Sequence, residues 1–236
     1  MTELKARALN ERVGTLTDGD CPICRNKGYV AVVDEDDNVI CRECICAAKR
    51  RSLSRIRRSG LSSMLEMFTF DKYLTKEAWQ VEIKTSALRF IEEGNGAWFI
   101  VSGPPGTGKT HICAAIAGAL IDGGKEARYL LWRKESPRLK ALVNEREEYE
   151  RQMRDYAKAD VLYIDDFWKG SVSDADKNLA FELIDDRYRA PGKTTIISSE
   201  KTIEQILSLD EAIGSRIYQR SKGHLAKTPA KNWRLT

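Results

Sequence analysis

The segment GPPGTGKT, residues 103–110, has the G-x-x-x-x-G-K-T spacing of a phosphate-binding loop. Glycine lacks a Cβ atom, so consecutive backbone N–H groups in such a loop can surround an anion, and the helix that follows adds positive potential. Lys109 would contact the β- and γ-phosphates, and the Thr110 hydroxyl would bind Mg²⁺. We therefore predict that a nucleotide contacts Gly103, Pro104, Pro105, Gly106, Thr107, Gly108, Lys109, Thr110 and His111.

Two acidic residues follow the apolar run at residues 161–164. Asp165 and Asp166 come at the carboxyl end of this predicted strand, which is where α/β folds place ligands. We expect Asp165 to hold Mg²⁺ together with Thr110, and Asp166 to orient or deprotonate the attacking water. No guanine-reading motif of the N-K-x-D type occurs in the chain, so ATP is the expected nucleotide.

Two further groups would complete a catalytic site. The predicted strand at residues 193–200 ends in polar residues, and Ser198 or Ser199 there would contact the γ-phosphate or the water. Arg216 and Arg220 are four residues apart on one face of a predicted helix. An arginine that reaches the γ-phosphate of a neighbouring subunit stabilises the transition state, and a surface salt bridge is the alternative role.

Five of the six cysteines lie in CPIC, residues 21–24, and CRECIC, residues 41–46. The sixteen residues between them alternate apolar positions around an Asp-Asp-Asn turn, which predicts a hairpin. Cysteines are rarely paired in a reducing compartment, so this spacing predicts a structural Zn²⁺ with four thiolate ligands, and free thiols are the alternative. The candidate ligands, one of them surplus, are Cys21, Cys24, Cys41, Cys44 and Cys46.

These groups need a scaffold that brings strand ends together. Strands are expected near residues 98, 127, 161 and 195, separated by helices, and this order predicts an α/β fold with a parallel sheet flanked by helices. We predict a zinc-binding module at residues 1–48, a basic linker at 49–75 and an ATPase domain at 76–236.

The overall charge and hydropathy exclude few classes of protein. The formal net charge of +4 says little about nucleic acid, although Lys and Arg cluster in the linker and after residue 216. No apolar run approaches the roughly 18 residues of a membrane span, and the first residues lack a signal-peptide core. We therefore expect a cytoplasmic protein without a membrane partner.

In order and spacing, these motifs resemble the DnaC-type and DnaI-type replicative helicase loaders of the AAA+ class, within the IstB-like ATP-binding superfamily, which include phage-encoded members. The resemblance implies that Asp165 is the first residue of the acidic pair, that the sensor lies at the end of the ISS strand, and that Arg216 is the arginine finger. It rests on the N-terminal cysteines and on RRSGL, FTFDKY, GPPGTGKTH, LYIDD, IISSE and DEAIGSRIYQR.

Two departures from the family pattern affect the expected chemistry. Many relatives have Asn where Glu200 stands, which leaves Ser199 or Glu200 as the sensing group. The domain also ends soon after Arg220, so a helical lid with a second sensor arginine is not expected. ATP turnover should therefore be slow and depend on assembly.

The connection after the second strand is long, and loaders and initiators of this kind have an extra helical element here that faces single-stranded DNA. One apolar stripe would run along a continuous helix, with packing in the core as the favoured role and stacking on bases, with phosphate contacts from Arg133 or Arg146, as the alternative. The stripe contains Leu139, Leu142, Arg146, Tyr149, Met153 and Tyr156.

The resemblance implies a specific function. The chain would use its zinc module to bind a hexameric replicative helicase, bind single-stranded DNA, form homo-oligomers through the ATP site and deliver the helicase during replication initiation. The implied cofactors are ATP, Mg²⁺ and Zn²⁺, and the implied catalytic residues are Asp166, Arg216 and Ser199. The alternative is an IstB-like transposition-helper ATPase that binds duplex DNA.

Overall fold

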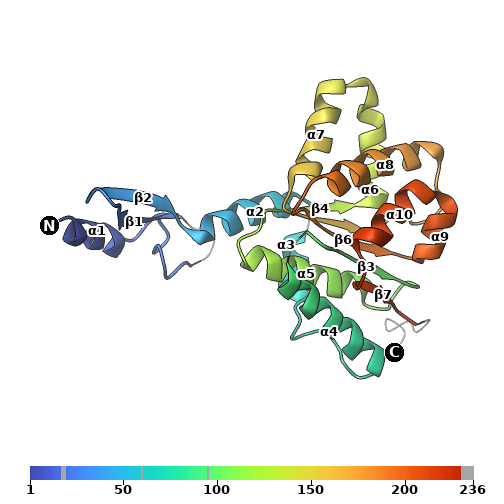
Figure 1. Ribbon diagram of the computed structural model, residues 1–236, viewed down its shortest axis with the longest axis horizontal. Coiled ribbons are helices and arrows are strands. Elements are labelled where there is room, and N and C mark those ends of the chain that lie inside the picture. The colour runs from blue at the N-terminus through green and yellow to red at the C-terminus, as the bar shows by residue number, and fades with distance from the viewer. Residues whose placement is uncertain (17–19, 60, 95, 230–236) are drawn as a thin grey trace.

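The computed structural model describes residues 1–16, 20–59, 61–94 and 96–229. A small N-terminal module lies at one end of the molecule and an α/β body at the other, and the helix α2 (Ile45–Ser59) joins them (Figure 1). Among the described residues, no helix combines the length and the apolar character needed to cross a membrane.

The body is built on a parallel sheet of five strands in the order β4-β5-β6-β3-β7. Ser102 lies opposite Ser199 in this sheet, and Leu131 lies opposite Asp165. All carboxyl ends therefore meet at one edge, where ligands of parallel sheets bind. The strands are β3 (Trp98–Ser102), β4 (Ala127–Leu131), β5 (Val161–Asp165), β6 (Thr194–Ser199) and β7 (Leu225–Lys227).

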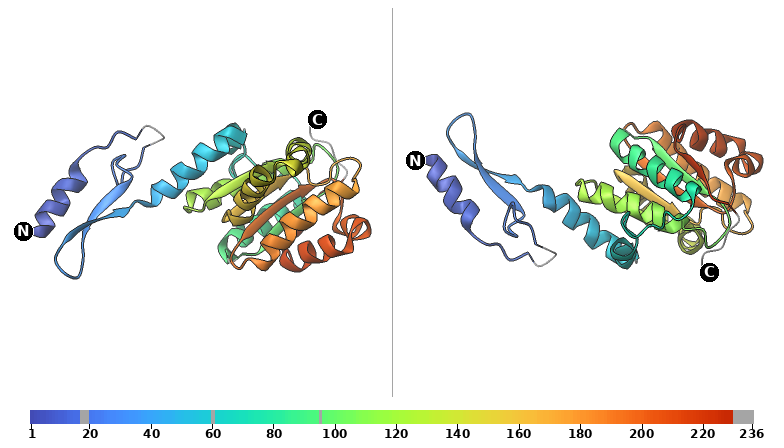
Figure 2. Two further views of the ribbon diagram at one scale, coloured as in Figure 1. Left: turned by 90° about the horizontal axis from the view of Figure 1, so that it is seen from above. Right: turned by 90° about the horizontal axis from the view of Figure 1, so that it is seen from below.

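Alternate residues of the strands supply two separate hydrophobic cores. In β3, Phe99 and Val101 pack in one core, whereas Trp98 and Ile100 pack in the other. Helices cover both faces of the sheet (Figure 2), which confirms the predicted α/β class and the four predicted strands. The first core is covered by α3 (Leu61–Met67), α4 (Ala78–Glu93) and α5 (Lys109–Asp122), and the second by α6 (Trp132–Ala141), α7 (Arg146–Lys158), α8 (Asp174–Arg189), α9 (Ile203–Leu209) and α10 (Glu211–Arg220).

The N-terminal module consists of α1 (Thr2–Glu11) and the antiparallel hairpin of β1 (Tyr29–Val33) and β2 (Val39–Glu43). The hairpin is the predicted one. Its turn is closed by the Asp34 carboxylate, which accepts hydrogen bonds from the backbone N–H groups of Asp36 and Asn38, at 3.1 and 2.8 Å.

The region expected to be a basic linker forms most of α2 and all of α3. Arg51 on α2 pairs with Glu43 of the hairpin and, at 3.1 Å, with Glu126 before β4. Lys49 pairs with Asp122 at the end of α5. These cations therefore connect the module to the body rather than remaining wholly available for DNA.

The predicted continuous stripe after β4 is interrupted. Helices α6 and α7 form a hairpin that projects from the body (Figure 1), with a short 3₁₀ turn at Leu142–Asn144 between them. Leu139, Met153 and Tyr156 are buried in the second core, as the packing interpretation expects. The prediction of one helix is wrong because the chain reverses at this turn so that both halves of the stripe pack on the same core.

Candidate nucleotide-binding site

The phosphate-binding loop lies between β3 and α5, as predicted from its spacing. Gly103 has φ +142°, a conformation that L side chains rarely adopt. A Cβ atom at Gly103 would lie 2.1 Å from Oγ1 of Thr228, so glycine is also required by the close approach of another segment.

Two side chains of the loop donate to one carbonyl group. Nζ of Lys109 lies 2.8 Å from the Pro104 oxygen, and Oγ1 of Thr107 lies 3.0 Å from it. Burial lowers the pKa of Lys109, although the charges of Glu200 and Asp166 act in the opposite direction. The loop thus holds a desolvated cation at its centre, which favours an anionic ligand.

The edge strand β7 supports the loop from the far end of the sequence. The backbone N–H of Thr228 donates to the Ser102 oxygen at 2.8 Å, and its hydroxyl donates to Oγ1 of Thr107 at 2.8 Å. Sequence analysis misses both β7 and Thr228, because a strand of three residues carries no recognisable periodicity.

Asp165 and Thr110 come together as predicted for a Mg²⁺ site. Oγ1 of Thr110 donates to Oδ1 of Asp165 at 3.3 Å, and Asp165 is only 5% exposed. Three further hydroxyl groups also donate to this carboxylate: those of Tyr129 at 3.0 Å, Tyr163 at 2.8 Å, and Ser198. A hydroxyl and a carboxylate are the oxygen ligands that Mg²⁺ prefers, so the donor set fits this ion.

Asp166 lies at the start of a tight turn after β5. Its φ is +54°, and its backbone N–H donates to Oγ of Ser198 at 3.0 Å. Oδ2 of Asp166 lies 3.2 Å from Nζ of Lys169, which in turn lies 2.9 Å from Oε1 of Glu200. Lys169 therefore bridges the two carboxylates, and the sequence patterns do not single it out.

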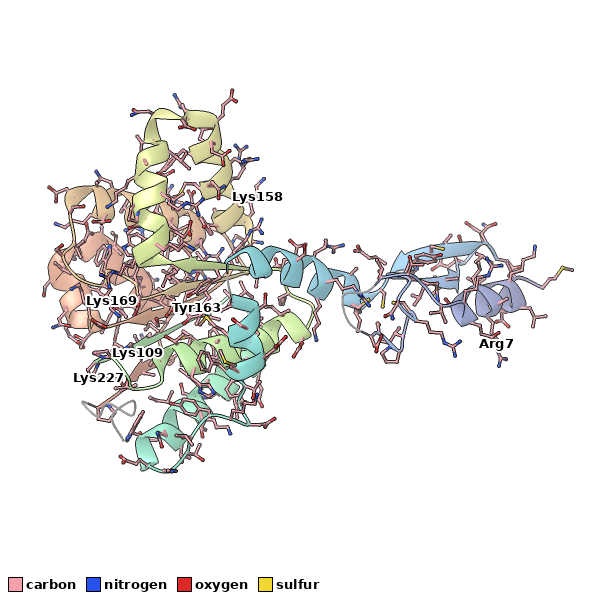
Figure 3. The ribbon with its side chains drawn as sticks, turned by 180° about the vertical axis from the view of Figure 1, so that it is seen from behind. Arg7, Lys109, Lys158, Tyr163, Lys169 and Lys227 are labelled. Atoms are coloured by element: carbon pink, nitrogen blue, oxygen red, sulfur yellow. The ribbon has the colours of Figure 1, made fainter. Side chains whose placement is uncertain are left out.

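The phosphate loop and the group of Asp166, Lys169 and Glu200 line one pocket of about 290 Å³, just below the roughly 300–1,000 Å³ typical of ligand sites. Figure 3 shows Lys109 and Lys169 at the same edge of the body. The pocket is lined by residues of the phosphate loop, by Asp166, Lys169 and Glu200, and by Phe68, Tyr73, Leu74, Gln80 and His111.

The aromatic part of the pocket comes from the FTFDKY segment. The centroid of the His111 ring lies 5.0 Å from that of Phe68 and 5.2 Å from that of Tyr73. Nε2 of His111 is 2.9 Å from the Thr69 oxygen. Burial lowers the pKa of His111. Flat apolar side chains beside a phosphate loop suit a nucleobase.

Ser199 does not lie where the sequence prediction places it. Its hydroxyl donates to the Phe167 oxygen at 2.8 Å and accepts from the Lys201 N–H at 3.0 Å, and it does not line the pocket. Successive strand side chains point to opposite sides, so Ser198 reaches Asp165 while Ser199 turns away. Glu200, the alternative left open by the sequence, lines the pocket instead.

The two candidate finger arginines have different surroundings, and neither lines the pocket. Arg220 donates to the backbone oxygens of Tyr188 and Ala190, at 2.8 and 3.1 Å. These carbonyl groups lie at the C-terminal end of α8. Arg216 pairs with Asp185 at 2.9 Å and lies over the Phe181 ring. Arg216 also donates to the Ala212 oxygen of its own helix at 2.7 Å. Arg220 thus joins α10 to the end of α8, whereas the backbone contact of Arg216 stays within α10.

Four of the five N-terminal cysteines form a cluster. All their sulfur atoms lie within 4.8 Å of one another, with Cys21 and Cys44 at 3.8 Å and Cys24 and Cys46 at 3.5 Å. Tetrahedral Zn²⁺ with bonds of about 2.3 Å requires sulfur atoms about 3.8 Å apart, so the set fits zinc. Cys41 is exposed on β2 and outside the cluster, which makes it the surplus cysteine.

Comparisons with known proteins agree on one group of ATPases. A family model described as IstB-like ATP binding protein matches residues 25–233. The uncharacterized protein YqaM of Bacillus subtilis is 24% identical over 257 residues, covering 87% of this chain and 81% of YqaM. The replicative helicase loader DnaC of Escherichia coli K12 is 28% identical over 163 residues, covering 68% of this chain but only 66% of the loader. A crystal structure of the DnaC helicase loader matches with a TM-score of 0.60 at 23% identity, over 69% of this chain and 97% of that one, and shows the shared fold.

Proposed function

Because the chain belongs to the IstB-like ATP-binding protein family, we propose that it is an AAA+ ATPase that loads a hexameric replicative helicase onto single-stranded DNA. The observation that carries this proposal is a pocket that combines the phosphate loop, including Lys109 and Thr110, with Asp166 at the end of β5. Asp165 lies next to this pocket and accepts a hydrogen bond from Thr110. The relatives named as helicase loaders support the choice of substrate.

The pocket residues divide into three roles toward ATP. The loop N–H groups and Lys109 bind the phosphates, while Thr110 and Asp165 supply oxygen ligands to Mg²⁺, which when bound neutralises phosphate charge. Asp166 orients the attacking water and accepts its proton at a carboxylate oxygen. Phe68 and Tyr73 supply the apolar surface for the base.

Hydrolysis in this proposal is slow and depends on assembly. Arg216 acts in a neighbouring subunit's site, where its guanidinium stabilises charge in the transition state. To do so, Arg216 exchanges its ion pair with Asp185 and its hydrogen bond to the Ala212 oxygen for the γ-phosphate, which carries more negative charge than one carboxylate. Arg220 is the less suitable residue because its Nη2 group donates to two carbonyl oxygens at the end of α8, so moving it breaks the contact between α10 and α8.

The N-terminal module, residues 1–48, binds the helicase. Zn²⁺ held by the four clustered cysteines stabilises a segment that is too small to form a large core of its own. Ile23 lies between Cys21 and Cys24 in sequence, and Ile45 lies between Cys44 and Cys46. These isoleucines are 55% and 73% exposed, which supports a docking surface for another protein.

The hairpin of α6 and α7 is the proposed contact with DNA. Arg133 at the start of α6 and Arg146 at the start of α7 are exposed cations that suit phosphates. Base stacking by the tyrosines of the stripe is not part of the proposal, because Tyr156 is buried and the Tyr149 hydroxyl donates to Glu182 at 2.6 Å.

The primary experiment measures binding of the chain to ATP and to a cognate hexameric helicase. The wild-type chain should bind ATP with Mg²⁺ and co-migrate with the helicase, and Lys109→Ala should abolish nucleotide binding or turnover. Removal of residues 1–50 should abolish co-migration. Failure of the wild-type chain to bind adenine nucleotide, with and without helicase, contradicts the proposal.

The second candidate is an IstB-like transposition-helper ATPase, favoured by the family description. A helper of this kind binds duplex DNA, whereas a loader binds single strands. Binding to both forms of DNA should be measured across a salt series, because phosphate contacts weaken with salt. A preference for duplex DNA at every salt concentration selects the helper.

A further inference from the structure

Two carboxylates line the pocket close to Lys109. Asp166 follows β5 and Glu200 follows β6, and both line the pocket. Glu200 replaces the neutral residue expected there from the resemblance to helicase loaders. A carboxylate at this position repels the terminal phosphate of a triphosphate, so the site needs a compensating cation.

Lys169 is placed to supply that cation. Its Nζ lies 3.2 Å from Asp166 and 2.9 Å from Glu200, and it lines the same pocket. The side chains of all three residues retain between 26% and 29% of their accessible surface, so these ion pairs face the pocket solvent.

The backbone fixes the direction of this lysine. Asp166 and Trp168 both have φ +54°, a left-handed conformation that non-glycine residues adopt only where the surroundings enforce it. The Trp168 ring is almost fully buried and stacks on Phe167 at 4.8 Å, and the Lys169 N–H closes the turn onto the Asp166 oxygen at 3.1 Å. The strained turn therefore returns Lys169 to the pocket beside Lys109 (Figure 3).

We propose that Lys169 is a second phosphate-contacting lysine that exchanges its ion pair with Asp166 for the γ-phosphate of ATP. This inference rests on the proposed nucleotide site. A lysine side chain is a flexible point charge, and exchanging a solvent-facing ion pair costs little. The γ-phosphate offers more negative charge than one carboxylate, whereas ADP lacks this group and leaves the Lys169–Asp166 pair in place.

The exchange has a consequence for the proposed base. In the ion pair with Lys169, one carboxylate oxygen of Asp166 is occupied by the lysine Nζ at 3.2 Å. When Lys169 turns to the γ-phosphate, Asp166 becomes available to the attacking water. Lys169 thus makes the Asp166 carboxylate available to the attacking water only when the γ-phosphate is present. Glu200, which pairs with Lys169, keeps the lysine near both Asp166 and the γ-phosphate.

The experiment compares affinities for a non-hydrolysable ATP analogue and for ADP, each with Mg²⁺, by calorimetric titration. Lys169→Met should weaken binding of the analogue roughly 10- to 100-fold, the range expected for loss of one charged hydrogen bond, and should change ADP affinity less than about threefold. Lys169→Arg should retain most of the preference for the analogue. Lys177→Met is the matched control, because Lys177 is also a paired lysine but lies on α8 and does not line the pocket.

A double variant separates contact from simple charge balance. If Lys169 only neutralised Glu200, Lys169→Met combined with Glu200→Gln would restore binding of the ATP analogue. The proposal expects that affinity to stay low in the double variant. Restoration, or an unchanged analogue-to-ADP ratio in Lys169→Met, overturns the role of Lys169 alone, whereas a wild-type chain that binds neither nucleotide overturns the proposed function together with it.

Discussion

The hydroxyl oxygens of Thr228 and Thr107 lie 2.8 Å apart, so the residue that follows the edge strand β7 is hydrogen-bonded directly to the phosphate-binding loop. The Thr107 hydroxyl in turn donates a hydrogen bond to the Pro104 oxygen at 3.0 Å, and Nζ of Lys109 donates to the same oxygen. The position of Lys109 therefore depends on a residue 121 positions further along the chain than Thr107.

Replacing Thr228 tests this support. Thr228→Val keeps the side-chain shape but removes the donor to Thr107, so nucleotide affinity should fall about fivefold, as expected for a neutral hydrogen bond of about 1 kcal/mol. Titration with ADP and Mg²⁺ measures this change, and Thr228→Ser should restore it. Equal affinities of wild type and Thr228→Val would show that β7 does not position the loop.

The two arginines of α10 should respond differently to truncation. Arg220→Ala removes donors to the end of α8, so the free energy of unfolding should fall by about 1–3 kcal/mol. Arg216→Ala also removes an ion pair with Asp185 and should lower the free energy of unfolding, but it should bind ATP normally and reduce hydrolysis in the assembled state. Urea unfolding and ATPase assays with helicase measure both effects. If Arg216→Ala hydrolyses ATP normally when assembled, its role in trans is wrong.

The cysteine cluster predicts a clear pattern of zinc binding. Cys41→Ser should retain one Zn²⁺ per chain, because Cys41 lies outside the cluster. Cys46→Ser removes one of four thiolate ligands and should lose most of the metal and the order of the hairpin. Elemental analysis of the purified variants measures the zinc, and zinc loss in Cys41→Ser with retention in Cys46→Ser would contradict the ligand set.

His111 should make stability depend on pH. Burial lowers its pKa, and the hydrogen bond to the Thr69 carbonyl opposes this with a smaller effect than that of burial. The charge of Lys72 lowers the pKa further. Below about pH 6.5 the unfolded chain therefore binds a proton more readily than the folded chain. The contribution of His111 to stability is therefore full above that pH and is lost progressively as the pH falls through 6.5 toward the folded pKa.

Urea unfolding at pH 7.5 and pH 5.5 measures the effect of His111. The wild type should lose more stability between these values than His111→Gln, which does not titrate, and comparing the two cancels contributions from other groups. The same loss in both chains would show that His111 is not responsible.

Local spacing in the sequence was sufficient to predict the phosphate loop, the acidic pair and the strands that carry them. Lys109 could be singled out because it follows a glycine-rich turn, and Asp165 because it follows an apolar run. Both patterns lie within a few residues of the side chain that they identify. The same holds for the cysteines, since two close pairs separated by a hairpin already predict a metal site.

Only the tertiary structure decided which members of each local set take part. Cys46 rather than Cys41 completes the cluster because the hairpin places Cys41 on an exposed strand position. Glu200 rather than Ser199 lines the pocket, and Lys169 joins it, because strand-end direction and a strained turn set the orientation of these side chains. Thr228 reaches the loop through strand pairing across more than a hundred residues, and sequence periodicity, which reports local conformation, carries no information about such contacts.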